Sequence, residues 1–180
     1  LIKDSQKKQE IGTVKKQDIL ENQVNIAYLA LGSNLGDKKN NLNKCIDLIQ
    51  KQGIFVKKKS KFYSTKSWPN ENHPDFINSL ILIETKLNIK ELFLKIKKIE
   101  KKLGRTKSKR NHPRVCDIDI IDYNREITHI KLGNHKLNTP HKRMHYRNFV
   151  LFPLYELDKN WVHPKFNKNI VILMSNLTSD

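Results

Sequence analysis

The chain has 180 residues, of which 37% are hydrophobic and 29% are charged, and its formal net charge is +17. This length suits one domain with its own core and is short for two. No apolar run approaches the roughly 20 residues that a membrane-spanning helix needs. The polar residues 1–23 show neither the apolar core of a secretion signal nor an Arg-rich transit pattern, so we expect a cytoplasmic location.

The positive charge is concentrated in one stretch of the chain. Residues 95–114 contain ten Lys and Arg side chains against Glu100 alone, whereas the segment 1–23 is nearly neutral. Such a cluster of positive charge is expected to attract a polyanion. The possible partners are nucleic acid, an anionic membrane surface and a polyphosphate ligand.

Strand and helix patterns alternate from residue 25 onward. Residues 25–31 predict a strand, and the turn after it ends at Asp37, a suitable N-cap for a helix with apolar residues at positions 42, 45, 46 and 49. The segments that follow predict a strand, a polar loop, a second strand, a helix that stops at Gly104, a basic loop and a third strand: 54–65, 66–74, 76–85, 89–103, 105–114 and 115–123. Beyond them we expect a short strand pair, a helical turn near 141–147 and an apolar segment at 149–157.

This order of elements predicts a ferredoxin-like α+β sandwich. In that fold class an antiparallel sheet carries helices packed on one of its faces, and here extra strand and helix elements would follow at the carboxyl end. We expect residues 1–23 to be a flexible lead-in or linker remnant and residues 24–180 to form a single domain. Cys45 and Cys116 lie in apolar patterns and are predicted to be buried thiols.

Two carboxylates in the last predicted strand carry the most chemical information. Side chains alternate between the faces of a strand, so Asp117 and Asp119 point the same way, while Cys116, Ile118 and Ile120 point into the core. Like charges held so close raise each other's pKa unless a cation lies between them, and hard oxygen ligands suit Mg²⁺. The basic loop runs directly into this pair, as phosphoryl transfer requires. Solvated carboxylates on an exposed strand face are the alternative.

Four blocks of sequence, in order along the chain, resemble the 6-hydroxymethyl-7,8-dihydropterin pyrophosphokinases. Together they extend over roughly residues 25–165. The blocks are 27–36, 62–65 with 73–78, Arg105 with 110–121, and 140–141 with 144–154. The resemblance implies that ATP, held by two Mg²⁺ ions on Asp117 and Asp119, is attacked at its β-phosphorus by the pterin hydroxymethyl oxygen, with AMP leaving, in folate synthesis.

The resemblance also assigns roles to individual residues. Arg105 and Arg114 match phosphate-contacting arginines, whose forked guanidinium groups suit phosphate oxygens. On the ATP side the family match adds Glu100, Lys107, Arg110, His141, Lys142 and Arg147. On the pterin side it places Gly32, Thr65, Trp68, Phe76, Asn78 and Phe149, of which Asn78 offers the donor and acceptor that a guanine-like edge needs.

Four positions depart from the family pattern. Asn111 stands where an aromatic residue is common, and His112 stands where Gly or Ala is usual. Lys66 replaces a common Pro, and Lys142 a common Tyr. The first two changes bear on how the basic loop covers the substrate, and none touches the aspartate pair.

Several alternatives remain open at this point. His141 and His145 are spaced to share one face of a helix and would suit zinc, although no third ligand lies at a familiar distance. A strongly basic ferredoxin-like sheet is also compatible with an RNA-binding module, but such modules carry aromatic residues where this chain has aspartates. A non-catalytic remnant is a third possibility. The polar lead-in and the lack of a first Met leave open a fusion to another folate-pathway enzyme domain.

Overall fold

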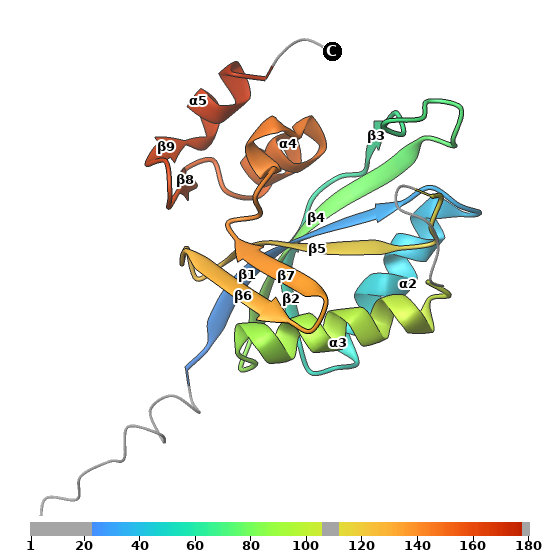
Figure 1. Cartoon of the computed structure of the whole chain (residues 1–180), viewed down its shortest axis with the longest axis horizontal. Helices are drawn as coiled ribbons and strands as arrows, with labels where there is room; N and C mark the ends of the chain where they lie inside the picture. Colours follow the sequence, from blue (N-terminus) through green and yellow to red (C-terminus); the bar gives the residue numbers. More distant parts are fainter. Residues whose placement is uncertain (1–22, 106–111, 178–180) are drawn as a thin grey trace, which may run out of the picture.

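A computed structural model describes residues 23–105 and 112–177 of the chain (Figure 1). The main sheet has the strand order β2-β4-β1-β5, β3 pairs with another part of β4, and all of these pairings are antiparallel. The strands are β1 (Asn25–Ser33), β2 (Phe55–Lys59), β3 (Tyr63–Thr65), β4 (Phe76–Thr85) and β5 (Asp117–Tyr123). This arrangement confirms the predicted ferredoxin-like α+β class.

The segment predicted as one strand, residues 54–65, forms two. The strand is interrupted near Ser60, whose hydroxyl accepts a hydrogen bond from the backbone N–H of Leu80 at 2.9 Å. After this point the chain pairs again with the beginning of β4, where Tyr63 lies opposite Asn78. A side-chain hydrogen bond to a strand 20 positions away is not visible in the hydrophobic pattern.

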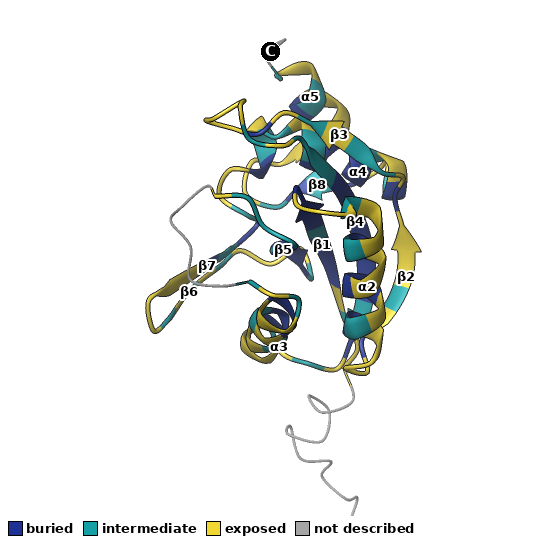
Figure 2. Ribbon diagram, turned by 90° about the vertical axis from the view of Figure 1, so that its right-hand side faces the viewer, coloured by how far each residue is buried: buried dark blue, intermediate teal, exposed yellow. Residues whose placement is uncertain are grey.

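Two helices, α2 (Lys38–Gln50) and α3 (Ile89–Lys102), cover one face of the sheet (Figure 1). The side chain of Asp37 caps α2 by accepting from the backbone N–H of Asn40, as the sequence predicts. The helices bury the predicted apolar positions against inward-facing strand residues, with Cys45 and Cys116 buried in the same core. Figure 2 shows β1 mainly buried, with exposed residues on the outer sides of α2 and α3.

A second apolar layer covers part of the opposite face. The predicted apolar segment is a helix, α4 (Asn148–Leu157), which follows a 3₁₀ turn at Met144–Tyr146 and packs against Tyr28, Leu80 and Leu82. The remaining elements are the hairpin β6 (Thr128–Leu132) and β7 (His135–Thr139), then β8 (Val162–His163), β9 (Lys168–Asn169) and α5 (Ile170–Ser175). On β4 this layer reaches Leu80 but not Asn78, which lies nearer the start of the strand. The predicted site residues gather around Asn78, at the uncovered end of this sheet face.

Two further findings bear on the sequence predictions. Within residues 23–105 and 112–177, no helix has the length and apolar character needed to cross a membrane. The lead-in predicted at residues 1–23 falls outside the described residues except for its last position, so the division into lead-in and single domain stays a prediction.

Candidate active site

The register of the sheet brings the two groups of predicted site residues together. Gly32 on β1 lies opposite Asn78 on β4 and, on its other side, opposite Asp117 on β5. Directly opposed residues share a sheet face, and neighbouring strands lie about 4.8 Å apart, so Asn78 and Asp117 flank Gly32 at a separation of about 10 Å. In the next row of this face, Ala30 lies opposite Asp119. Small residues on the central strand leave space between the flanking side chains.

Asp117 is held by two guanidinium groups. Nη1 of Arg105 donates to its Oδ1 at 2.7 Å, and Nη1 of Arg114 donates to its Oδ2 at 2.9 Å. Burial tends to raise the pKa of Asp117, but Arg114 and Arg105 outweigh burial and hold the pKa below its ordinary value of 3.8. The repulsion expected within the aspartate pair is therefore relieved by arginines even without a metal ion.

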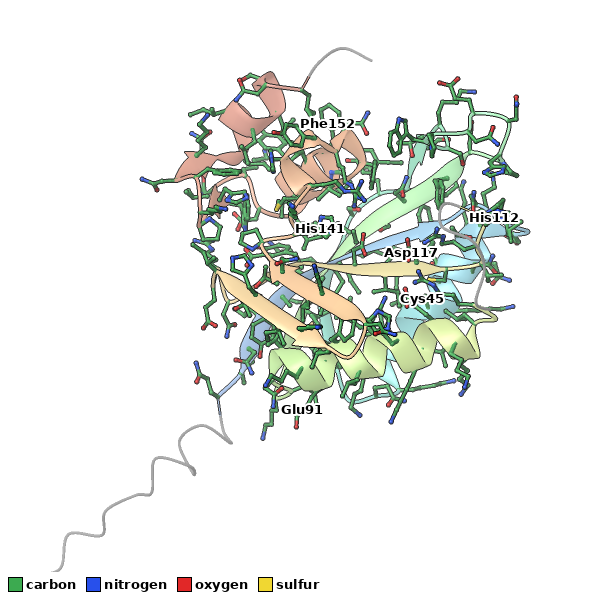
Figure 3. All side chains as sticks on the ribbon, viewed as in Figure 1. Cys45, Glu91, His112, Asp117, His141 and Phe152 are labelled. Atoms are coloured by element: carbon green, nitrogen blue, oxygen red, sulfur yellow. The ribbon has the colours of Figure 1, made fainter. Side chains whose placement is uncertain are left out.

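Asp119 faces two nitrogen-bearing side chains from the carboxyl-terminal part of the chain, those of Arg147 and His141. Nη1 of Arg147 lies 3.3 Å from its Oδ2, and Nε2 of His141 lies 4.0 Å from the same oxygen. Figure 3 labels Asp117 on β5 and His141 on the side toward α4. Burial lowers the pKa of His141 more than the Asp119 charge raises it, so the imidazole is mainly neutral at pH 7.

The glycine row forms the other half of the site. The amide nitrogen of Asn78 donates to Oγ1 of Thr65 at 2.9 Å, which fixes the orientation of the amide. A Cβ placed on Gly32 would lie 3.1 Å from Oδ1 of Asn78 and 3.5 Å from Cδ1 of Phe76. A larger residue here would press on the Asn78 amide, so glycine favours the close approach of these side chains. Four of the residues predicted on the pterin side, Gly32, Thr65, Phe76 and Asn78, are brought together.

Asn34 is a site residue that the sequence analysis did not single out. It is almost fully buried, and its Oδ1 accepts the backbone N–H of Arg114 at 2.7 Å. Its Nδ2 donates to Oγ of Ser67 at 3.3 Å and to the carbonyl of Pro74 at 3.2 Å. One amide therefore joins the turn after β1, the loop between β3 and β4, and the segment that enters β5.

The remaining predicted residues differ in their placement. Phe149 is the second residue of α4, and the guanidinium of Arg147 lies 5.4 Å from the centre of its ring. Trp68 is 77% exposed, so little of the protein covers its ring. Lys107 and Arg110 lie outside the described residues.

A cavity of about 240 Å³ lies between the β6–β7 hairpin and the carboxyl-terminal turn. His141 and Lys142 both line it, so the structure brings these two predicted ATP-side residues together. The residues that line the cavity include neither the aspartates nor Asn78.

The donor set fits a magnesium ion that is shared with a ligand. Among the described residues, no group of three or more His, Cys, Asp or Glu side chains could hold a metal ion. His141 and His145, the pair considered for zinc, therefore have no third ligand of these types among them. Mg²⁺ is commonly bound through one or two carboxylates together with phosphate oxygens and water. Asp117 and Asp119 supply two such carboxylates on one strand face.

Paired carboxylates with arginines around them are the side chains that phosphate-transferring proteins use for a phosphorylated ligand and its divalent cation. Residues 28–159 match the family model described as 7,8-dihydro-6-hydroxymethylpterin-pyrophosphokinase (HPPK), and the chain belongs to this family. The resemblance drawn from the sequence motifs is confirmed.

Curated relatives agree with this assignment. The 2-amino-4-hydroxy-6-hydroxymethyldihydropteridine pyrophosphokinase of Aquifex aeolicus is 38% identical over 141 residues, which cover 78% of this chain and 85% of the relative. The protein of the same name from Bacillus subtilis is 41% identical over 134 residues, covering 74% and 78%. The folate synthesis bifunctional protein of Pisum sativum is 37% identical over 129 residues, covering 72% of this chain and 24% of that protein.

Solved structures share the fold. The HPPK-DHPS protein of Plasmodium falciparum superposes with a TM-score of 0.69 at 19% sequence identity, over 87% of this chain and 42% of that one. At this identity the likeness supports the architecture alone.

Proposed function

We propose that this protein transfers a pyrophosphoryl group from ATP to 6-hydroxymethyl-7,8-dihydropterin and releases AMP, a step of folate synthesis. Its membership of the HPPK family supports this assignment. The observation that carries the proposal is the row in which Gly32 separates Asn78 from Asp117. A pterin bound at the amide and a triphosphate bound at the aspartates would meet above this glycine.

The pterin is proposed to bind on the Asn78 side. The amide orientation set by Thr65 presents one acceptor to the ligand, and a neutral amide recognises a lactam edge without a buried charge. Phe76 lies beside Gly32, and we assign it and Phe149 to the faces of the ring.

The triphosphate is proposed to bind on the aspartate side. Arg105, Arg114 and Arg147 already surround the two carboxylates, and their guanidinium groups would turn to phosphate oxygens when ATP enters. His141 and Lys142 would contact the nucleoside half of ATP from the neighbouring cavity.

Two Mg²⁺ ions are proposed to accompany ATP and to be held by Asp117 and Asp119. When bound, such ions neutralise charge on the phosphate oxygens and align the attacking and leaving oxygens. The chain supplies the two carboxylates on one rigid strand, and the arginines balance the charge of the site before the ligands arrive.

The reaction needs no nucleophilic side chain. The hydroxymethyl oxygen forms a bond to the β-phosphorus and loses its proton, while the bond from the β-phosphorus to the α,β-bridging oxygen breaks and that oxygen leaves with AMP. Asn78 and the arginines contribute by holding the two reactants in line and by stabilising charge on the transferred group.

The direct test is AMP formation from ATP and Mg²⁺ with and without the pterin alcohol, with the product analysed by phosphorus NMR. We expect AMP only when the pterin is present, and a product that carries two linked phosphorus atoms. Release of ADP with a singly phosphorylated pterin, or AMP formation without pterin, would overturn the proposal. The cytoplasmic location and a fusion to another folate-pathway domain stay predictions of the sequence.

A further inference from the structure

Glu100 lies beneath the aspartate strand rather than in the open part of the site. Its side chain is 1% exposed, on the α3 face of the sheet, although the family match counts it among the ATP-side residues. Nζ of Lys97 donates to its Oε2 at 2.7 Å. A carboxylate so enclosed leaves little surface for a direct contact with ATP.

The backbone of β5 fixes Glu100 next to Asp117. β5 is the last strand of the main sheet, so alternate N–H groups on its outer side have no neighbouring strand. Oε1 of Glu100 accepts one of these, the N–H of Ile118, at 2.9 Å. The carboxylate is thereby tied to the residue that lies between Asp117 and Asp119.

Arg105 connects this buried carboxylate to the site. Its Nη1 donates both to Oε1 of Glu100 and, at 2.7 Å, to Oδ1 of Asp117. Because Arg114 also donates to Asp117, that aspartate would stay paired if Arg105 turned away from it. Arg105 in turn would stay held by Glu100.

We propose that Glu100 is a positioning residue that anchors Arg105, so that the guanidinium can exchange Asp117 for a phosphate oxygen of ATP without leaving the site. This inference rests on the proposed function. In it, Glu100 affects ATP binding by holding Arg105 in place, and not by contacting the nucleoside. The buried carboxylate holds one N–H of Nη1, and the other N–H is exchanged between Asp117 and the ligand.

The test uses Glu100→Gln, Arg105→Met and the double variant, in the full chain. Glutamine keeps an oxygen for the N–H of Ile118 and removes the charge that holds Arg105. Affinities are measured by calorimetry for adenosine, AMP and a non-hydrolysable ATP analogue, each with Mg²⁺. Glu84→Gln, half-buried near the end of β4 and paired with Lys57, removes the same charge away from the site and serves as the control.

We expect Glu100→Gln to weaken binding of the ATP analogue about tenfold, the size of one charge-assisted hydrogen bond, and to leave adenosine binding unchanged. In the Arg105→Met background the same substitution should have little further effect, because its target is already absent. An equal loss of adenosine affinity, or a full effect of Glu100→Gln in the Arg105→Met protein, would overturn the proposal.

The Glu100→Asp variant and the activity of the wild-type protein provide two further measurements. If the glutamine variant does not fold, Glu100→Asp retains the charge one methylene short of Arg105 and should show the same selective loss for the triphosphate. Failure of the proposed function would instead appear in the wild-type protein, as an absence of pterin-dependent AMP formation. The two proposals can therefore fail separately.

Discussion

The two sides of Gly32 are built on different physical principles. On the carboxylate side, Asp117 and Asp119 are paired with the guanidinium groups of Arg105, Arg114 and Arg147. On the amide side, which comprises Gly32, Thr65, Phe76 and Asn78, the described hydrogen bond joins two neutral groups.

This difference predicts how each side responds to its ligand. The amide side is held by strand register and by hydrogen bonds from Asn78 to Thr65 and to the carbonyl of Tyr63, so a planar ligand would enter with little rearrangement. The carboxylate side has its charges already neutralised, so metal and phosphate must replace internal ion pairs. We therefore expect the amide side to be preorganised for its ligand. On the carboxylate side, binding should depend on the exchange of internal ion pairs for contacts with metal and phosphate.

The largest effect is expected from removing a carboxylate charge. Asp117→Asn and Asp119→Asn should each reduce pterin-dependent AMP formation by about three powers of ten or more, since metal coordination supplies several kcal/mol of transition-state stabilisation. Turnover assays with thermal unfolding check this. Near-normal turnover in either variant would remove the metal assignment, whereas loss of turnover with unfolding would show only that the strand needs the carboxylate.

A smaller and selective effect is expected on the amide side. Asn78→Ala should weaken pterin binding about 10- to 100-fold, because a lost buried hydrogen bond costs about 1–3 kcal/mol. Binding of a non-hydrolysable ATP analogue should be nearly unchanged. Calorimetry with each ligand separately distinguishes the two, and an equal loss for the ATP analogue would show that the sides are not independent.

Gly32→Ala should produce the mildest loss of pterin binding. The added methyl group would press on Oδ1 of Asn78 at 3.1 Å, and overpacking of about 1 kcal/mol corresponds to about a fivefold weaker pterin. Ala30→Gly, one row along the same strand, is a matched change that adds no atom near Asn78. Unchanged pterin affinity in Gly32→Ala would show that the amide can move away, and would weaken the case for preorganisation.

Local patterns in the sequence predict the elements and the carboxylate face well. Asp37 and the apolar spacing after it define α2, and the alternation in β5 places Asp117 and Asp119 together because a strand has a period of two. The family motifs add the pterin-side residues, four of which are adjacent in the structure.

Long-range partners explain what the sequence analysis missed. Asn34 acquires its role from the backbone of Arg114, 80 positions away, and nothing in its local pattern signals that contact. The sequence predicts that a cation relieves the repulsion within the aspartate pair, but it does not show which one. In the structure Arg105 reaches Asp117 across 12 positions, and against the effect of burial Arg114 and Arg105 lower the pKa of this carboxyl. These features depend on which segments the tertiary fold brings to the edge of β5.

On the carboxylate side, the proposed mechanism requires that a metal ion replace arginine–aspartate ion pairs. This central requirement is tested most directly by titrating the nucleotide-free protein with Mn²⁺, a paramagnetic substitute for Mg²⁺. The concentration of free Mn²⁺ is measured by electron paramagnetic resonance. Wild-type protein should bind Mn²⁺ weakly, and Arg105→Met should bind it several-fold more tightly, because one guanidinium competing for Asp117 is removed. Arg125→Met, which removes an exposed charge paired with Asp158, should behave like the wild type. Equal or weaker Mn²⁺ binding by Arg105→Met would contradict the account.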